Sequence, residues 1–237
     1  MTVKKQNKPF AIIGALDAEI DEYIKHLKNS RKNIWKKFVF YEGDLYKKQV
    51  IIIKSGVGKV SAAMTAQKLI DTYNPTYIIF TGVAGGLNNK FEIGDIIVGK
   101  DCAQYDLNAI ELGFSRGTIP YTNFRFFKTD AKLRDLALTA KIKHTIYEGR
   151  ILTGDQFLTR KDIKEYNYLV DELKGDAVDM ESASIGQVCT LNNVPFLIIR
   201  TISDKADGNS LINFNKFLPE VTKNSFGMVQ HILKEYK

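Results

Sequence analysis

The sequence contains few of the residues that build disulfide frameworks and metal centres. Its 237 residues include two cysteines, Cys102 and Cys189, and three histidines, His26, His144 and His231. The cysteines are far apart in otherwise apolar surroundings, which favours buried free thiols over a disulfide framework. The histidines show no metal-ligand spacing, so a zinc site is not indicated. We therefore expect a protein without a bound metal or cofactor.

Long hydrophobic runs are also missing. The stretch "FAIIGAL" from Phe10 is short and is not followed by a small-residue cleavage site. No segment of the sequence approaches the roughly 20 apolar residues that a membrane-spanning helix needs. We therefore expect a cytoplasmic protein without a membrane span.

The formal net charge of +7 is spread along the chain and is not gathered in one block. The densest basic stretches are "MTVKKQNK" at the N-terminus and "RKNIWKK" from Arg31. We interpret the first as part of a flexible N-terminal extension over residues 1–8 and the second as a solvated turn. Scattered lysines indicate no specific nucleic-acid partner, although weak binding to polyanions is consistent with the charge.

β-rich runs alternate with segments of helical period along the whole chain. A hairpin is expected around residues 42–44, and a less regular region from Asp101 to Phe127. The pattern predicts an α/β fold in one domain over residues 1–237, with helices packed on a mostly parallel sheet. The β-rich runs include "FAIIGAL", "TYIIFTGVAGGL", "GDIIVGK" and "PFLIIRTISD", and the helical segments include "AEIDEYIKHLKN", "KVSAAMTAQKLIDTY", "MESASIGQVCTLNN" and residues 215–237.

Four loops at expected strand or helix ends carry the chemistry. In open α/β sheets, ligands bind beyond the carboxyl ends of the strands. These loops combine carboxylates with a Gly-rich turn and contain no histidine or cysteine, although each acidic residue taken alone also fits a helix cap. Such a set suits cleavage through a cationic sugar-like transition state, in which an acid protonates the leaving group and a carboxylate activates water. The loops are "GALDAE" (14–19), "TGVAGGL" (81–87), "VDMES" (178–182) and "RTISDKAD" (200–207).

Two glycine-containing turns do not match nucleotide-binding motifs. In "SGVGKVSAA", Ile53 stands at the position where a phosphate-binding loop needs glycine, and Val60 stands where it needs serine or threonine. A tight turn between a strand and a helix is the better interpretation. "TGVAGGL" lacks the glycine spacing of the dinucleotide fingerprint, but its glycines allow a ligand to approach the backbone closely.

The chain resembles a known enzyme family in seven blocks that occur in the family's order and spacing from about Phe10 to the C-terminal helix. The blocks are "IIGALDAEI", "KSGVGKVSAA", "TGVAGGL", "GDIIVG", "TGDQFL", "VDMESASIGQVC" and "PFLIIRTISDKAD". They are similar to those of the 5′-methylthioadenosine/S-adenosylhomocysteine nucleosidases, members of the nucleoside phosphorylase superfamily. The resemblance implies a three-layer α/β/α fold with a mixed central sheet, a homodimer, and irreversible hydrolysis of an adenine nucleoside.

The resemblance also implies roles for individual residues. Glu19 matches the glutamate that activates water, and Asp204 matches the aspartate that protonates adenine N7. Met180 and Glu181 match the pair that contacts the ribose, and we expect Arg200 to orient Glu181 and the water network. The remaining matches are Gly85 and Ser203 in the substrate site, Phe157 and Leu158 beside the purine, Phe214 as a cap over the ligand, and Leu112, Phe114 and Pro120, from "LNAIELGFSRGTIPY", in the partner subunit's pocket.

Some positions depart from the family pattern, and some alternatives remain open. Val83 stands where the family often has serine, and Asp179, like Asp176, is interpreted as a solvated or helix-capping residue. The runner-up functions are a phosphate-dependent nucleoside phosphorylase and an aminodeoxyfutalosine nucleosidase. A polyanion-binding protein that keeps the fold as a scaffold is a further alternative. The residues do not rank methylthioadenosine, S-adenosylhomocysteine, 5′-deoxyadenosine and aminodeoxyfutalosine as substrates.

Overall fold

The computed structural model describes residues 8–158, 160–204 and 210–237, and their side chains except those of 160, 161, 163 and 210–221. The strands are β1 (Phe10–Gly14), β2 (Lys28–Trp35), β3 (Phe38–Leu45), β4 (Lys48–Lys54), β5 (Tyr77–Gly86), β6 (Ile96–Gln104), β7 (Phe127–Lys128), β8 (Ile146–Thr153), β9 (Ala177–Asp179) and β10 (Phe196–Asp204). The helices are α1 (Asp17–His26), α2 (Lys59–Tyr73), the short 3-10 helix η1 (Ile110–Leu112), α3 (Ala131–Leu138), α4 (Arg160–Glu165), α5 (Tyr168–Asp171), α6 (Ser182–Leu191) and α7 (Ser210–Glu235).

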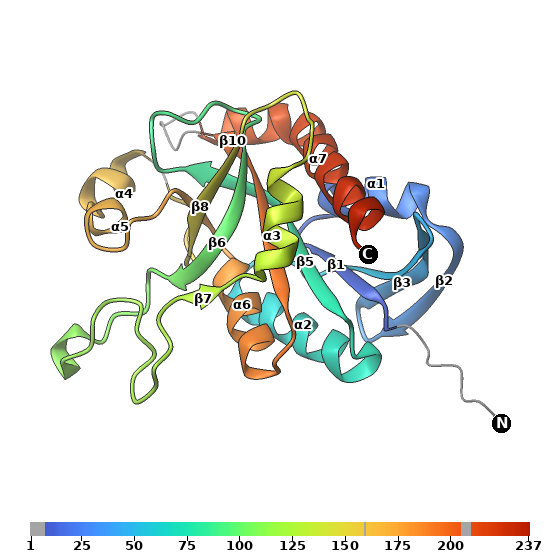
Figure 1. Ribbon diagram of the computed structural model, residues 1–237. Coiled ribbons are helices and arrows are strands. Elements are labelled where there is room, and N and C mark those ends of the chain that lie inside the picture. The colour runs from blue at the N-terminus through green and yellow to red at the C-terminus, as the bar shows by residue number, and fades with distance from the viewer. Residues whose placement is uncertain (1–7, 159, 205–209) are drawn as a thin grey trace.

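The strands form one mixed, 10-stranded sheet (Figure 1). β1 lies parallel to β4 on one side and to β5 on the other. β5 also lies parallel to β10 and antiparallel to β9. Because β10 pairs with β6, β6 with β8, and β8 with β9, this half of the sheet closes on itself as a ring. The other half continues outward through β4, β3 and β2.

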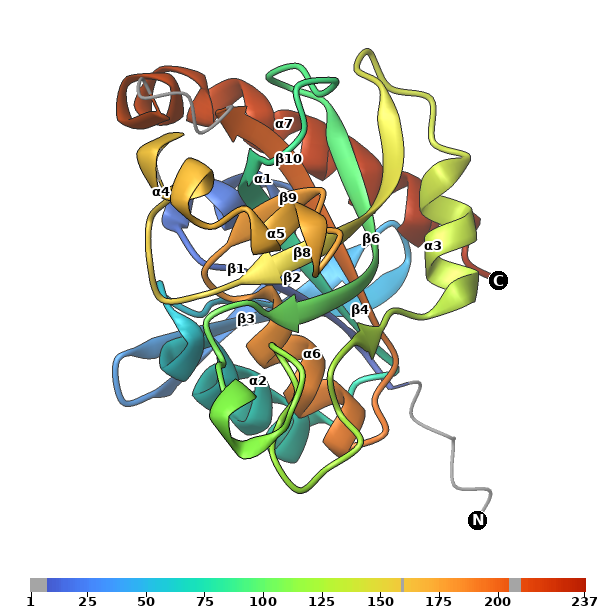
Figure 2. The same cartoon turned by 90° about the vertical axis from the view of Figure 1, so that its left-hand side faces the viewer.

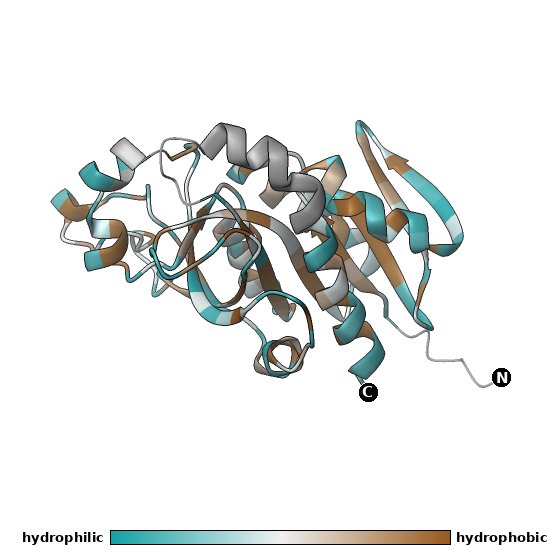
Figure 3. Cartoon of the chain, turned by 90° about the horizontal axis from the view of Figure 1, so that it is seen from above, coloured by the Kyte–Doolittle hydropathy of each residue, from teal (hydrophilic) through white to brown (hydrophobic). Residues whose placement is uncertain are grey.

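Alternating side chains on the central strands explain the layers on the two faces of the sheet. On β1, Phe10 and Ile12 pack in the apolar cluster that contains residues of α1, α3 and α7, whereas Ala11 and Ile13 pack in the cluster that contains residues of α2 and α6. Both faces of these strands are therefore buried, as in a parallel sheet covered by helices. Figure 2 shows α7 and α6 on opposite sides of β10, and Figure 3 shows the apolar residues concentrated in the sheet. The expected α/β layers with a mixed central sheet are confirmed.

The outer part of the sheet differs from two of the sequence expectations. The hairpin expected around residues 42–44 is wrong, because β3 runs through Gly43 and the chain reverses at Tyr46 and Lys47, which have φ values of 50° and 66°. Gly43 is needed inside the strand because a Cβ there would lie 2.5 Å from the carbonyl oxygen of Lys28. The stretch from Arg31 to Lys37, expected as a solvated turn, is only partly a turn: residues 31–35 lie in β2, and Lys36 and Lys37 form the turn to β3. The exposed polar residues of β2 suit an unpaired sheet edge.

Other short elements were also missed by the sequence expectations. The region from Asp101, expected to be irregular, begins with the last four residues of β6, because this strand extends to Gln104. β9 and α5 are 3 and 4 residues long, too short for a periodic pattern to reveal. Residues 1–7 of the expected N-terminal extension lie outside the described residues. Among the helices of the described part of the chain, none has the length and apolar character needed to cross a membrane.

Candidate active site

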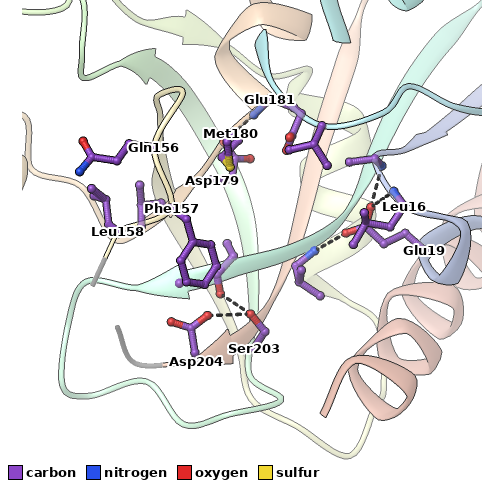
Figure 4. Close-up of a pocket in the computed structure, with 16 residues that line it drawn as sticks. Leu16, Glu19, Gln156, Phe157, Leu158, Asp179, Met180, Glu181, Ser203 and Asp204 are labelled. Carbon is purple, nitrogen blue, oxygen red and sulfur yellow. Dashed lines mark hydrogen bonds between the residues drawn. The ribbon is translucent and has the colours of Figure 1, made fainter. Parts of the chain in front are cut away.

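A pocket of about 340 Å³ opens beyond the carboxyl ends of β1, β5, β9 and β10 (Figure 4). It is the place where the four loops singled out from the sequence converge. The register of the strands sets its layout, because Arg200 on β10 pairs with Gly82 on β5 and Asp204 pairs with Gly85. Carboxylates and apolar groups line it together, including Glu19, Asp179, Glu181, Asp204, Leu16, Val57, Val83, Phe157, Leu158 and Met180.

Glu19 lies in the first turn of α1 and points its carboxylate back toward the preceding loop. One oxygen accepts hydrogen bonds from the backbone N–H groups of Ala15 and Leu16, at 2.6 and 2.9 Å, and the other accepts from Val83 N–H at 3.0 Å. Burial raises the pKa of Glu19, while the nearby Arg200 charge and these N–H groups act in the opposite direction. Since Val83 uses its backbone, this contact does not depend on the hydroxyl that a serine would provide.

Gly82 allows this arrangement. A Cβ at position 82 would lie 2.4 Å from Glu19 Oε1 and 2.3 Å from Arg200 Nη1. Such distances are far below van der Waals contact, so the two charged groups can both approach β5 at this point because the residue has no side chain. Within the Gly-rich turn, Gly82 is therefore the residue that leaves room for Glu19 and Arg200. The sequence analysis named Gly85 in this turn and did not name Gly82.

Asp204 ends β10 on another side of the pocket from Glu19 (Figure 4). Ser203 Oγ donates a hydrogen bond to Asp204 Oδ2 at 3.0 Å, and Asp204 Oδ1 lies 3.4 Å from where a Cβ of Gly85 would be. The labelled ring of Phe157 lies beside Asp204 and Ser203 in the figure. Phe157 is 47% exposed and Leu158 5%, so the loop after β8 contributes one open and one buried apolar side chain. The predicted residues Asp204, Ser203, Gly85, Phe157 and Leu158 are therefore brought together.

Met180 and Glu181 directly precede α6, where Glu181 is the N-cap, and both line the pocket. Glu181 Oε1 accepts a hydrogen bond from Gly58 N–H at 2.9 Å, where Gly58 has a φ of 91° at the start of α2. Burial, and then the negative charge of Asp179, raise the pKa of Glu181 to about 7, against the opposing effect of Arg200. Glu181 therefore changes charge near neutral pH.

Asp179 corrects one sequence interpretation, because it is not a solvated residue. Its side chain is 2% exposed and accepts hydrogen bonds from Thr153 Oγ1 at 2.6 Å and from Arg200 Nε at 2.8 Å. It also accepts from the N–H and hydroxyl of Ser182, so the capping part of the interpretation holds. The sequence signal for this burial is Arg200, which lies within the apolar strand run "FLIIRTISD". A buried charge is normally paired, so an arginine inside such a strand indicates a buried acidic partner.

The charge pattern of the pocket limits its chemistry. Among the described residues that line it, none is lysine, arginine or histidine, and Arg200 lies behind the lining with 1% exposed. The described part of the chain contains no group of His, Cys, Asp and Glu placed to hold a metal ion. The site can therefore hold a neutral ligand between acid and base groups, with apolar walls on the remaining sides.

Residues 9–234 match the family model of the phosphorylase superfamily. The 5′-methylthioadenosine/S-adenosylhomocysteine nucleosidase of Buchnera aphidicola is 36% identical to the chain over 227 residues, which cover 94% of this chain and 95% of that protein. The chain belongs to this nucleosidase family.

Solved structures of similar chains have the same fold. The nucleosidase from Neisseria meningitidis, in complex with methylthio-immucillin-A, has a TM-score of 0.90 and 32% identity, and the match covers 96% of this chain and 99% of that one. The futalosine hydrolase of Helicobacter pylori has a TM-score of 0.90 and 30% identity, with 96% and 98% of the two chains covered. The expected nucleoside phosphorylase-like architecture is confirmed.

Three residues assigned from the family resemblance lie apart from this group. Leu112, Phe114 and Pro120 do not occur among the described lining residues of the pocket in their own chain. They belong to the segment between β6 and β7, which projects from the sheet (Figure 1). The side chain of Phe214 lies outside the described side chains. Val57, in contrast, lines the pocket from the turn after β4, and the strand-end rule applied to "KSGVGK" would have found it.

Proposed function

We propose that this nucleosidase hydrolyses the N-glycosidic bond of 5′-methylthioadenosine, S-adenosylhomocysteine and 5′-deoxyadenosine. The products are adenine and the 5′-substituted ribose, and the enzyme is an N-glycosyl hydrolase. The observation that carries the proposal is the placement of Glu19, Glu181 and Asp204 around one pocket with apolar walls. The names of the relatives in the family, and the methylthio-immucillin-A bound to the Neisseria meningitidis enzyme, support the same substrate class.

Asp204 activates the leaving group. Adenine is a poor leaving group as an anion but departs readily when N7 is protonated, so the reaction needs an acid beside that atom. Asp204 supplies the proton, and the hydrogen bond from Ser203 fixes one of its two oxygens. Phe157 and Leu158 provide apolar surface for the purine, and the lack of a side chain at Gly85 leaves room for the base beside Asp204.

Glu19 and Glu181 act on the sugar side. As the base departs, positive charge develops on the ribose, and the ionised Glu181 stabilises it through hydrogen bonds with the hydroxyls while Met180 lies against the ring. Glu19 removes a proton from the water that attacks the anomeric carbon. The backbone N–H groups that hold its carboxylate reduce its freedom before the substrate binds, so less reorganisation is needed during the reaction.

The charges around the site favour water over phosphate as the nucleophile. A phosphorylase needs cationic or hydroxyl groups for the anion. None of the described lining residues is a cation, and Arg200, which faces Glu19 and Glu181, lies behind the lining. Asp179 already binds its Nε, and Glu181 lies 3.8 Å from its Nη2, so carboxylates surround this cation. Product analysis tests the choice. We expect the free ribosyl sugar at full rate in phosphate-free buffer, whereas a rate that depends on added phosphate would contradict hydrolysis.

Aminodeoxyfutalosine is a second candidate substrate. The observation that favours it is the likeness to the Helicobacter pylori futalosine hydrolase, at 30% identity over nearly the whole of both chains. Both substrates carry a base, a ribose and a 5′ substituent, so the same carboxylates would serve either reaction. Steady-state kcat/KM values for methylthioadenosine, S-adenosylhomocysteine, 5′-deoxyadenosine and aminodeoxyfutalosine, measured on one enzyme preparation, will establish the preference.

We further propose that the whole chain acts as one nucleosidase domain and forms a homodimer in the cytoplasm, where it serves methionine salvage. The family match over residues 9–234 supports a single domain. Exposed apolar side chains support an interface, with Leu112 63%, Tyr121 87% and Val60 78% exposed. In such a dimer, Leu112 and its neighbours Phe114 and Pro120 would form part of the partner subunit's pocket. Light scattering across protein concentrations measures the oligomeric state.

A further inference from the structure

Asp179 lines the pocket with an almost fully buried side chain, yet the mechanism above gives it no task. It ends β9 and pairs in register with Thr153 on β8, which explains the 2.6 Å hydrogen bond from the Thr153 hydroxyl to Oδ1. Ser182 N–H donates to the same oxygen at 3.2 Å, and the Ser182 hydroxyl donates to Oδ2. Asp179 is therefore fixed by β8 and by the first residue of α6, and Oδ2 also accepts from Arg200 Nε at 2.8 Å.

The Arg200 guanidinium lies between the two carboxylates that act on the sugar. Its Nη2 is 3.8 Å from Glu181 Oε2 and has no hydrogen-bond partner among the described residues. Its Nη1 and Glu19 Oε1 both lie in the space beside Gly82 where a Cβ would be. The carbon of the guanidinium lies 3.9 Å from the centre of the Phe80 ring, a distance typical of a cation–π contact.

A buried guanidinium ordinarily forms a direct, often bidentate pair with a carboxylate. With Glu19 and Glu181 on its two sides, such a pair would occupy oxygens that must bind water or ribose hydroxyls. We propose that Asp179 is a positioning residue that holds Arg200 by its Nε edge and so keeps Glu19 and Glu181 out of a direct hydrogen bond with the guanidinium. This role rests on the proposed function, since it concerns the availability of these two carboxylates.

The same contact has an electrostatic consequence at Glu181. The charged groups that face Glu181 are Asp179, Arg200 and Glu19, and its other partner is the Gly58 N–H. Asp179 raises the pKa of Glu181 by repulsion, and Arg200 lowers it. Replacing Asp179 by asparagine removes the repulsion and frees the guanidinium to bond with Glu181. Both changes lower the pKa of Glu181.

The test compares the wild-type enzyme with Asp179→Asn in phosphate-free buffer, from about pH 5 to about pH 9. We expect the acid limb of kcat/KM for methylthioadenosine to move by about one pH unit to lower pH. At neutral pH we expect KM to rise about tenfold, because Glu181 is now paired with Arg200. Asp179→Glu, which restores the charge, should recover most of the wild-type pH profile.

Thr153→Val is the matched structural control. It removes a hydrogen bond to Asp179 and should lower the melting temperature, but it leaves the charges in place, so the acid limb should stay at the wild-type pH. In the double variant Asp179→Asn/Arg200→Gln, the acid limb of kcat/KM should return toward the wild-type pH. Both the negative charge that raises the pKa of Glu181 and the positive charge that lowers it are then absent. A folded Asp179→Asn enzyme with unchanged pH profile and KM would overturn the inference.

A second measurement does not require Asp179→Asn to fold. In a structure of the wild-type enzyme with a bound nucleoside analogue, Arg200 Nε should remain on Asp179, with no direct hydrogen bond between Arg200 and Glu181. A direct hydrogen bond between the Arg200 guanidinium and the Glu181 carboxylate would overturn the inference. If wild-type enzyme fails to hydrolyse nucleosides without phosphate, the proposed function fails; if it succeeds and Asp179→Asn behaves like wild type, only the role of Asp179 fails.

Discussion

Replacing Gly82 by alanine tests whether the geometry of Glu19 and Arg200 matters to catalysis. The added methyl group would lie 2.4 Å from Glu19 Oε1 and 2.3 Å from Arg200 Nη1. Neither neighbour can tolerate such a distance, so the carboxylate, the guanidinium or the strand must move. A shift of about 1 Å restores ordinary contact, and a displacement of that size at a reacting group typically costs about 100-fold in rate.

A control is available four residues along the same strand. A Cβ at Gly86 would have its nearest neighbours at 3.5 and 3.7 Å, which is ordinary van der Waals contact. Gly86→Ala should therefore keep kcat/KM within about threefold of the wild-type value, because the added methyl displaces no group of the site. Gly82→Ala should lose about 100-fold or more in kcat/KM and about 1–3 kcal/mol in the free energy of unfolding.

The assay is steady-state adenine release for both variants, with thermal unfolding recorded on the same samples. The unfolding curves give the fraction of folded enzyme, and kcat/KM is calculated per folded molecule. A loss of activity caused by a displaced active site is thereby distinguished from one caused by unfolding. Wild-type kcat/KM in folded Gly82→Ala enzyme would refute the reasoning, because it would mean that Glu19 and Arg200 need not occupy the positions described.

The remaining predictions concern Glu181, Phe157 and Leu112. Activity should fall as the pH drops below about 7, since Glu181 must be ionised and its pKa is raised to about 7; Glu181→Gln should raise KM and abolish this dependence in a pH–rate profile. Folding raises this pKa from its ordinary value of 4.5, so the wild-type enzyme loses stability as the pH rises from about 4.5 through about 7. Glu181→Gln has no such group, so its melting temperature should increase relative to that of the wild type over the same pH range. Phe157→Ala should raise KM about tenfold with little change in melting temperature, because the ring is 47% exposed; an unchanged KM would remove Phe157 from the purine site. Leu112→Ser should weaken the dimer in light scattering and raise KM for substrates with 5′ thioether groups, and a monomeric enzyme with normal KM would contradict its place in the partner's pocket.

The sequence located the site because the carboxyl ends of parallel strands meet at one edge of the sheet. That rule brought together the loops that contain Glu19, Glu181 and Asp204, although these residues are far apart in the chain. The roles assigned to them came from the family resemblance. The residue types alone supported only a general acid, a carboxylate base and a cationic transition state.

The features that escaped prediction depend on strand pairing or on short elements. The burial of Asp179 results from the register of β9 with β8, which leaves no local pattern. The arginine within the apolar strand β10 signals a buried acidic partner, but it does not indicate which acidic residue that partner is. Gly43 looks like a turn residue in sequence, but the close approach of Lys28 requires glycine inside β3. The ring of strands closes through β9, whose 3 residues are too few to show periodicity.

The central claim is that Glu19 activates water and Asp204 protonates adenine. Adenine release from methylthioadenosine in phosphate-free buffer tests it most directly when wild type, Glu19→Gln and Asp204→Asn are compared, with Asp17→Asn as a control at an exposed acid of the same helix. The account predicts full activity for wild type and Asp17→Asn, and a loss of about 100-fold to 10,000-fold for each of the other two variants, with fold and dimer retained. Near-normal turnover by folded Glu19→Gln or Asp204→Asn enzyme would contradict it.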